Sequence, residues 1–175
     1  VEALSMSSNA QGVILQTNKG PIETSNCIIA TNGFAKQWIE DDINPARAQI
    51  IVTNKIKNLK VKGTFHFQKG YYYFRNIGNR ILLGGGRNLD FKGETTESFE
   101  TTPKIQKKLE ELLRFTIIPN QEFSIDYAWS GIMGVGDVKS PILKMLNKNT
   151  AVGVRLGGMG VALGSQVGKS LANYF

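Results

Sequence analysis

The sequence predicts an α+β fold in which a mixed, largely antiparallel β-sheet is flanked by helices. Short β-branched and aromatic runs between residues 64 and 83 are separated by turn residues, which is typical of an antiparallel meander. An amphipathic helix is predicted from Pro103 to about Phe115. The end of the chain, residues 150–173, has the pattern of a strand, a glycine-rich turn and a helix.

The first forty residues predict a hairpin. Residues 12–17 are β-branched and apolar, residues 18–20 supply turn chemistry, and an extended pattern resumes at residues 22–30. The apolar run 27–30 is typical of a strand that is buried on both faces. A short helical stretch is expected from Phe34 to Ile39.

A second group of strands is predicted after Pro45. Residues 48–53 form the first strand, and Phe65 and Phe67 alternate with His66 in the next. Residues 71–75 and 80–83 continue the meander, and Gly84, Gly85 and Gly86 end it. Alternation along a strand sends Tyr72 to the opposite face from Tyr71 and Tyr73.

The helix from Pro103 has two start signals and an apolar face. Thr102 suits the N-cap, proline suits the first helical position, and one face carries Ile105, Leu109, Leu112 and Leu113. The following strand alternates strictly: Phe123, Ile125, Tyr127 and Trp129 share one face, and Ser124, Asp126, Ala128 and Ser130 share the other.

Composition excludes several classes of protein. The chain has 175 residues, of which 41% are hydrophobic and 20% charged, as in ordinary globular domains. No apolar run approaches the roughly 20 residues of a membrane span and no signal sequence is recognisable, so we expect a cytoplasmic protein. The lone Cys27 cannot form an internal disulfide, and no Cys/His cluster has the spacing of metal ligands. The net charge of +7 invites an acidic partner, but no nucleic-acid-binding motif accompanies it.

The closing turn, Arg155–Gly160, is the first candidate for a binding site. Glycines let the backbone approach a planar or anionic group closely, and the N-terminus of a helix presents unpaired N–H groups. Too little chain follows for a dinucleotide fingerprint, which needs another strand and an acidic residue further on. The turn is therefore expected to meet a ligand that is held mainly by something else. Within the helix, Gly160, Gly164, Gly168 and Ala172 lie on one face and would allow close packing against a neighbour.

Several motifs occur in a fixed order along the chain: Ala30-Thr31-Asn32-Gly33, the turn 45–49, Tyr73-Phe74-Arg75 followed by 80–85, the segment 126–131 with Asp137 and Pro141, and Gly158-Met159-Gly160-Val161. In this order they resemble the latter half of the flavin-dependent D-amino-acid oxidase-like superfamily, which includes glycine, sarcosine and amine oxidases. The resemblance covers nearly the whole chain.

The resemblance implies a split architecture. A Rossmann-like domain would bind FAD, and its N-terminal part would be missing from this sequence, which begins abruptly at Val1. Residues 1–33 would lead back to that FAD domain, 34–148 would form the substrate-binding domain, and 149–175 would supply the closing strand and helix of the FAD domain. We expect noncovalent FAD, because no cysteine lies near the motifs that would face the flavin.

The resemblance also implies site residues. The residues expected to contact FAD are Ala30, Thr31, Asn32, Arg47, Gly157, Gly158, Met159, Gly160 and Val161. Those expected to contact substrate are Tyr71, Tyr73, Arg75, Met133 and Arg155. Two positions depart from the family pattern, since Met133 stands where glycine-oxidase-like members place an arginine for the substrate carboxylate, and Met159 replaces a common histidine. The pattern therefore favours an amine or a longer substrate over an α-amino acid.

Three functions remain open at this level. The first is the C-terminal portion of an FAD-dependent enzyme that oxidises the C–N bond of an amine or amino acid by hydride transfer to flavin, inactive without its N-terminal half. In that case the cofactor performs the difficult step, and we single out no catalytic acid, base or metal. The second is a basic module that binds nucleic acid or another acidic partner. The third is a degenerate relative that kept the fold and lost the flavin.

Overall fold

The computed structural model describes residues 1–175, which form two compact units. The first contains residues 1–44 and 133–175, and the second contains residues 45–132. The chain leaves the first unit at the start of β5 (Asn44–Thr53) and returns to it near the end of β9 (Ile125–Val135). None of the helices combines the length and the apolar composition needed to cross a lipid bilayer.

One sheet of the first unit contains β1 (Ala3–Ser8), β2 (Val13–Thr17) and β3 (Ile22–Thr24). The predicted hairpin is confirmed as the antiparallel pair β2–β3, in which Val13 faces Thr24 and Leu15 faces Ile22. Strand β1 pairs antiparallel with β2 and was not predicted. Its mostly small and polar residues carry no strand signal of their own, so the pairing with β2 decides its conformation.

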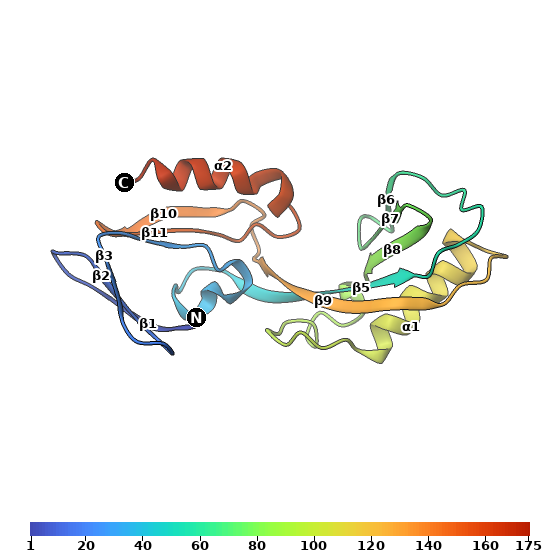
Figure 1. Cartoon of the computed structure of the whole chain (residues 1–175), viewed down its shortest axis with the longest axis horizontal. Coiled ribbons are helices and arrows are strands. Elements are labelled where there is room, and N and C mark those ends of the chain that lie inside the picture. Colours follow the sequence, from blue (N-terminus) through green and yellow to red (C-terminus); the bar gives the residue numbers. More distant parts are fainter. The chain divides into compact units, whose positions relative to one another are not determined.

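The other sheet of this unit has the order β10 (Ile142–Asn147), β11 (Thr150–Val154) and β4 (Cys27–Ile29). Strand β4 runs parallel to β11, with Ile28 facing Ala151. Helix α2 (Gly160–Ala172) covers the sheet (Figure 1) and packs Val167 and Leu171 against Ala151. The prediction that the 27–30 run is buried on both faces is wrong, because Ile29 is buried whereas Ile28 is 43% exposed.

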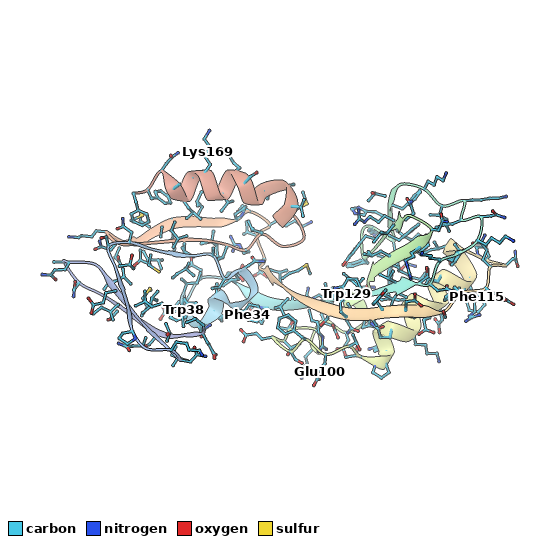
Figure 2. The ribbon with its side chains drawn as sticks, in the orientation of Figure 1. Phe34, Trp38, Glu100, Phe115, Trp129 and Lys169 are labelled. Carbon is cyan, nitrogen blue, oxygen red and sulfur yellow. The ribbon has the colours of Figure 1, made fainter.

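A short 3₁₀ helix, η1 (Asn32–Gln37), follows β4 and confirms a helical stretch in this region. Its Ala35 belongs to a core that also includes Ile29, Ile43 and Val152. Trp38, labelled in Figure 2, packs against this core from just beyond the helix.

The second unit is built on a five-stranded sheet. Its order is β6 (Thr64–Phe67), β7 (Tyr72–Ile77), β8 (Arg80–Gly85), β5 and β9. The first three strands are antiparallel neighbours, which confirms the predicted meander. Helix α1 (Pro103–Leu112) packs on the sheet, and Tyr72 is fully buried in the core between them, whereas Tyr71 is exposed.

The four apolar positions of the predicted helix are all buried: Ile105, Leu109, Leu112 and Leu113. The α-helix ends at Leu112 and continues as a π-helical turn, η3 (Leu113–Ile117). Thr102 stands at the N-cap position, but its side chain does not cap the helix. Its hydroxyl instead accepts a hydrogen bond of 2.8 Å from Nε2 of Gln49.

Strand β9 is covered only in part. Phe123, just before the strand, and Ile125 pack against the core of the second unit. Further along, Tyr127 is 59% exposed, and Trp129, which is labelled in Figure 2, is 42% exposed. The strict alternation therefore identified the strand without identifying how much of it is buried.

Candidate functional site

The glycine-rich turn after β11 is fixed by contacts from two other segments. The backbone N–H of Leu156 donates to Oδ1 of Asn32 over 3.1 Å, and the N–H of Gly157 donates to the carbonyl of Gly134 over 3.0 Å. Asn32 has a φ of +46°, a left-handed conformation that asparagine adopts more readily than most residues. Asn32 thus joins the Ala30–Gly33 motif to the last turn, two motifs that are far apart in sequence.

The outer side of this turn is open. An added Cβ at Gly157 or Gly158 would have no atom within 4 Å. Met159 is 58% exposed, and the side chain of Val161, in the first turn of α2, is fully exposed. Backbone N–H groups in the first turn of a helix lack partners within the helix, so this end of α2 can receive an electron-rich group. Ala30 and Thr31, next to Asn32, are also exposed.

The row of small residues along α2 does not pack against the sheet. An added Cβ at Gly164 or Gly168 would have no neighbour within 4 Å, whereas one at Gly153 in β11 would lie 2.4 Å from Cδ1 of Leu171. Close packing between α2 and its sheet therefore depends on Gly153. The close neighbour predicted for the row on α2 is not found within these 175 residues.

Arg155, a predicted substrate-binding residue, is engaged by its own unit. Its Nε donates to the carbonyl of Ser140 over 3.0 Å, and its NH1 donates to the carbonyl of Asp42 over 2.8 Å and to Oδ2 of Asp42 over 3.3 Å. The same Oδ2 accepts the backbone N–H of Asp137 over 2.7 Å. These contacts support a structural role for Arg155, and contact with substrate stays a prediction. Met133, also in the first unit, is half-buried.

The second unit contains the predicted tyrosines and Arg75. Tyr73 lies across Gly84 on the neighbouring strand, where an added Cβ would come within 2.7 Å of the phenol ring. Burial raises the pKa of the Tyr73 phenol. Tyr71 is exposed and meets the ring of Phe91 edge-on, with centroids 6.4 Å apart. Arg75 is exposed on β7, where it pairs in register with Leu82.

Arg47, predicted to contact FAD, lies in a buried ion pair. Its Nε and NH2 donate to the two carboxylate oxygens of Glu94 over 2.9 and 2.8 Å. Nε2 of Gln49 donates to the same oxygens over 2.9 Å. Burial alone would raise the pKa of Glu94, but the hydrogen bonds from Arg47 and Gln49 more than offset it, so this pKa is lowered. The contacts support a structural role, and contact of Arg47 with FAD stays a prediction.

The sequence did not identify this network or the Arg155–Asp42 contact. Arg47 and Glu94 are 47 residues apart, and Arg155 and Asp42 are 113 apart. Neither pair belongs to a spacing motif, so no local signal could have joined the partners.

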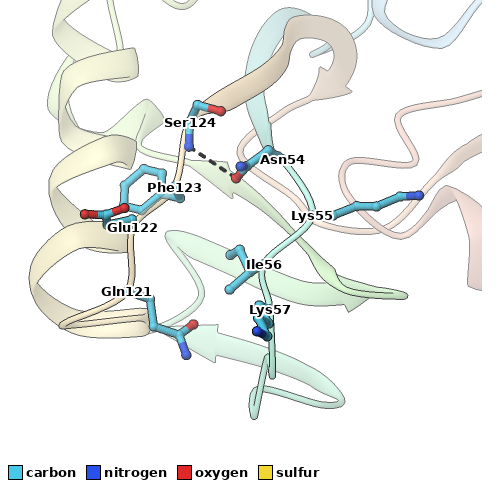
Figure 3. Close-up of a pocket in the computed structure, with 8 residues that line it drawn as sticks. All are labelled: Asn54, Lys55, Ile56, Lys57, Gln121, Glu122, Phe123 and Ser124. Atoms are coloured by element: carbon cyan, nitrogen blue, oxygen red, sulfur yellow. Dashed lines mark hydrogen bonds between the residues drawn. The ribbon is translucent and has the colours of Figure 1, made fainter.

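A separate hollow of about 600 Å³ lies in the second unit (Figure 3). The segments 54–57 and 121–124 line it, and the N–H of Ser124 donates to Oδ1 of Asn54 across one side over 3.2 Å. None of the predicted site residues lines this hollow. No group of three or more His, Cys, Asp or Glu side chains gathers where it could hold a metal ion.

Comparison with known proteins identifies the fold. The family model described as "DAO: FAD dependent oxidoreductase" matches residues 1–174. No curated protein matches the sequence. Glycine oxidase from Geobacillus kaustophilus is similar in structure, with a TM-score of 0.79 and 18% identity, over 99% of this chain and 47% of that chain.

Two further solved structures give the same picture. Iminodiacetate oxidase from Chelativorans sp. BNC1 has a TM-score of 0.78 at 20% identity, over 97% of this chain and 47% of that one. L-Proline dehydrogenase from P. horikoshii has a TM-score of 0.76 at 19% identity, over 98% of this chain and 48% of that one. The chain therefore spans about half the length of these solved proteins, and identities this low show a shared fold.

Proposed function

This chain belongs to the family of FAD-dependent oxidoreductases, and from that premise we propose that the protein oxidises the C–N bond of an amine or amino acid by hydride transfer to flavin. The observation that carries the proposal is the turn at residues 155–160. It is held from behind by Asn32 and Gly134, and is open in front at Gly157 and Gly158. This is the arrangement that a close-fitting planar ligand requires.

The residues at this turn fit the isoalloxazine end of FAD. Gly157, Gly158, Met159, Gly160 and Val161 would lie along the flavin, and Ala30, Thr31 and Asn32 would lie near the dinucleotide. Bound FAD would supply the electron acceptor for the oxidation. This chain would position the flavin and provide a positive electrostatic potential beside it. The N-terminus of α2 is the positive end of the helix dipole and favours negative charge nearby. We propose noncovalent binding.

The substrate proposal depends on Met133 and on the contacts of Arg155. A methionine thioether cannot form the bidentate pair that a carboxylate forms with arginine. Arg155 already donates three hydrogen bonds to Ser140 and Asp42. We therefore favour an amine, or an amino acid whose carboxylate is bound at another position, with Tyr71, Tyr73 and Arg75 on the substrate side.

The domain roles expected from the sequence remain part of the proposal. Residues 34–148 would bind the substrate, and residues 1–33 and 149–175 would belong to the FAD domain. Because the chain spans about half of the solved structures it resembles, we expect these 175 residues alone to bind FAD weakly and to be inactive. We propose a cytoplasmic location for the whole protein.

Anaerobic reduction of the flavin in the full-length protein tests the proposal. The purified protein is reconstituted with FAD, freed of excess cofactor and mixed with primary amines, N-alkyl amines and α-amino acids in turn. We expect a yellow protein whose visible flavin absorbance is lost with at least one of these compounds and is restored by an oxidant. Failure to retain FAD, or retained FAD that no amine or amino acid reduces, contradicts the proposal.

A further inference from the structure

Arg87 is an arginine that forms no ion pair. It begins the short 3₁₀ helix η2 (Arg87–Leu89), directly after the meander and the left-handed Gly86. The residue is half-buried, and its Nε is buried without a hydrogen-bond partner. Its one hydrogen bond runs from NH2 to the hydroxyl of Thr95 over 3.4 Å, which is long for such a bond.

The acidic side chain whose charge reaches Arg87 is Glu94, and it is already occupied. Its two oxygens accept hydrogen bonds from Nε and NH2 of Arg47 and from Nε2 of Gln49. An ionised carboxylate has about four acceptor positions, and these bonds use them. Glu94 is therefore the partner of Arg47, and Arg87 has no ion pair of its own.

The ring of Phe91 gives this arginine one apolar neighbour. The guanidinium carbon of Arg87 lies 5.0 Å from the centroid of the Phe91 ring, and Tyr71 meets that ring edge-on. Phe91 is 49% and Tyr71 44% exposed, so both rings present surface to a ligand. The contact with Phe91 leaves NH1 of Arg87 without a hydrogen-bond partner and able to donate to an acceptor.

The structure assigns to Arg87, Phe91 and Tyr71 a binding site for a small organic carboxylate with an apolar body. A carboxylate can accept two parallel hydrogen bonds from a guanidinium, and in Arg87 only NH2 has a partner, through the long bond to Thr95. The body of the ligand would cover the exposed rings of Phe91 and Tyr71. Binding would also supply the counter-charge that a partly desolvated arginine otherwise lacks. The site shares Tyr71 with the substrate side proposed above, but carboxylate binding at Arg87 requires neither flavin nor turnover, so its test is independent of the proposed function.

An NMR titration of the ¹⁵N-labelled full-length protein tests the site directly. Phenylacetate is the probe, and phenylacetamide, which has the same ring without the charge, is the control. We expect phenylacetate to shift the Nε–Hε signal of Arg87 saturably and phenylacetamide to leave it unchanged. Equal shifts with the two compounds, or no shift with phenylacetate, overturn the assignment. Inorganic phosphate that binds as tightly as phenylacetate overturns the preference for a carboxylate.

Variants then identify the side chains responsible. Arg87→Gln, which removes the charge, should weaken phenylacetate binding by about tenfold or more. Arg87→Lys keeps the charge but loses the fork, and should give an intermediate affinity. Lys92→Gln removes a neighbouring exposed charge and should leave the affinity unchanged. Equal weakening by Arg87→Gln and Lys92→Gln would show general charge attraction and overturn the site. Should Arg87→Gln fail to fold, the wild-type titration and the affinity of Arg87→Lys still test whether Arg87 binds the carboxylate.

Discussion

The phenol ring of Tyr73 lies directly across Gly84 of the neighbouring strand, in the space that any larger residue would fill. An added Cβ at Gly84 would come within 2.7 Å of the ring, and the two residues are register partners in the β7–β8 pair. The adjacent Gly85 has a comparable role, since its Cβ would come within 2.1 Å of the carbonyl oxygen of Tyr71. These glycines thus set the position of the tyrosines that we place on the substrate side.

Gly84→Ala is expected to displace Tyr73 and to destabilise the protein by about 1–3 kcal/mol, the usual cost of overpacking. Urea unfolding measures the loss. Tyr73→Ser removes the ring, so in the double variant the added methyl group should cost much less than it does alone. Purely additive losses in this double-mutant cycle would contradict the proposed contact.

Glu94→Gln is expected to destabilise the protein by about 3 kcal/mol at neutral pH, because it leaves the guanidinium of Arg47 buried without its counter-charge. Chemical denaturation measures the change in the free energy of unfolding. Glu110→Gln alters an exposed glutamate on α1 and should change stability by less than about 0.5 kcal/mol. Similar losses in the two variants would show that the Arg47–Glu94 pair has no special importance.

The same carboxyl predicts a pH dependence. The pKa of Glu94 in the folded protein lies below its ordinary value of 4.5. A lowered folded pKa contributes stability that is present above the unfolded pKa and is lost as the pH falls through the folded pKa. The stability difference between wild type and Glu94→Gln should therefore be constant near neutral pH and shrink on acidification below pH 4.5. Unfolding curves at a series of pH values measure it, and a difference that stays constant into strong acid would refute the assignment.

Asn32 is expected to hold the closing turn through its side-chain oxygen. Asn32→Ala removes the acceptor for the N–H of Leu156 and places a residue with a Cβ but no local hydrogen bond at a positive φ. Asn32→Ala should lower the free energy of unfolding by about 1–3 kcal/mol. Asn32→Gly keeps the backbone conformation and loses the acceptor, whereas Asn32→Asp keeps an acceptor. Hydrogen exchange at the Leu156 amide should speed up in the Ala and Gly variants and stay slow in the Asp variant. Unchanged exchange in Asn32→Gly would exclude the bond as the cause.

Gly158→Leu is expected to weaken FAD binding to the full-length protein without unfolding the first unit. The new side chain would project into open space, because a Cβ at Gly158 has no neighbour within 4 Å and its φ is not in the left-handed region. Lys148→Leu, in the β10–β11 turn at the other end of β11, is the control for an added exposed leucine. Equilibrium dialysis measures the affinity for FAD, and thermal unfolding measures stability, so weakened binding is separated from unfolding. FAD affinity that is the same in wild type and Gly158→Leu would place the flavin elsewhere.

Much of the fold followed from local patterns in the sequence. Turn residues located the β2–β3 hairpin and the β6–β7–β8 meander, and the start signals at Thr102 and Pro103 located α1. Strand β1 was missed because its residues become a strand only by pairing with β2. The partial exposure of Ile28 was missed because an apolar run does not indicate which faces of its strand are covered by other segments.

The β2–β3 hairpin, the meander, helix α1 and the glycine-rich turn before α2 could be predicted from residue types at short spacings, and the order of the motifs indicated the family by resemblance. The partners of the charged groups depend on the tertiary structure. It pairs Arg47 with Glu94 and Arg155 with Asp42, and it leaves Arg87 without a carboxylate. Each of these outcomes depends on which distant segments meet. The Arg47–Glu94 pair lies in the interior, where the low dielectric makes the partner energetically important.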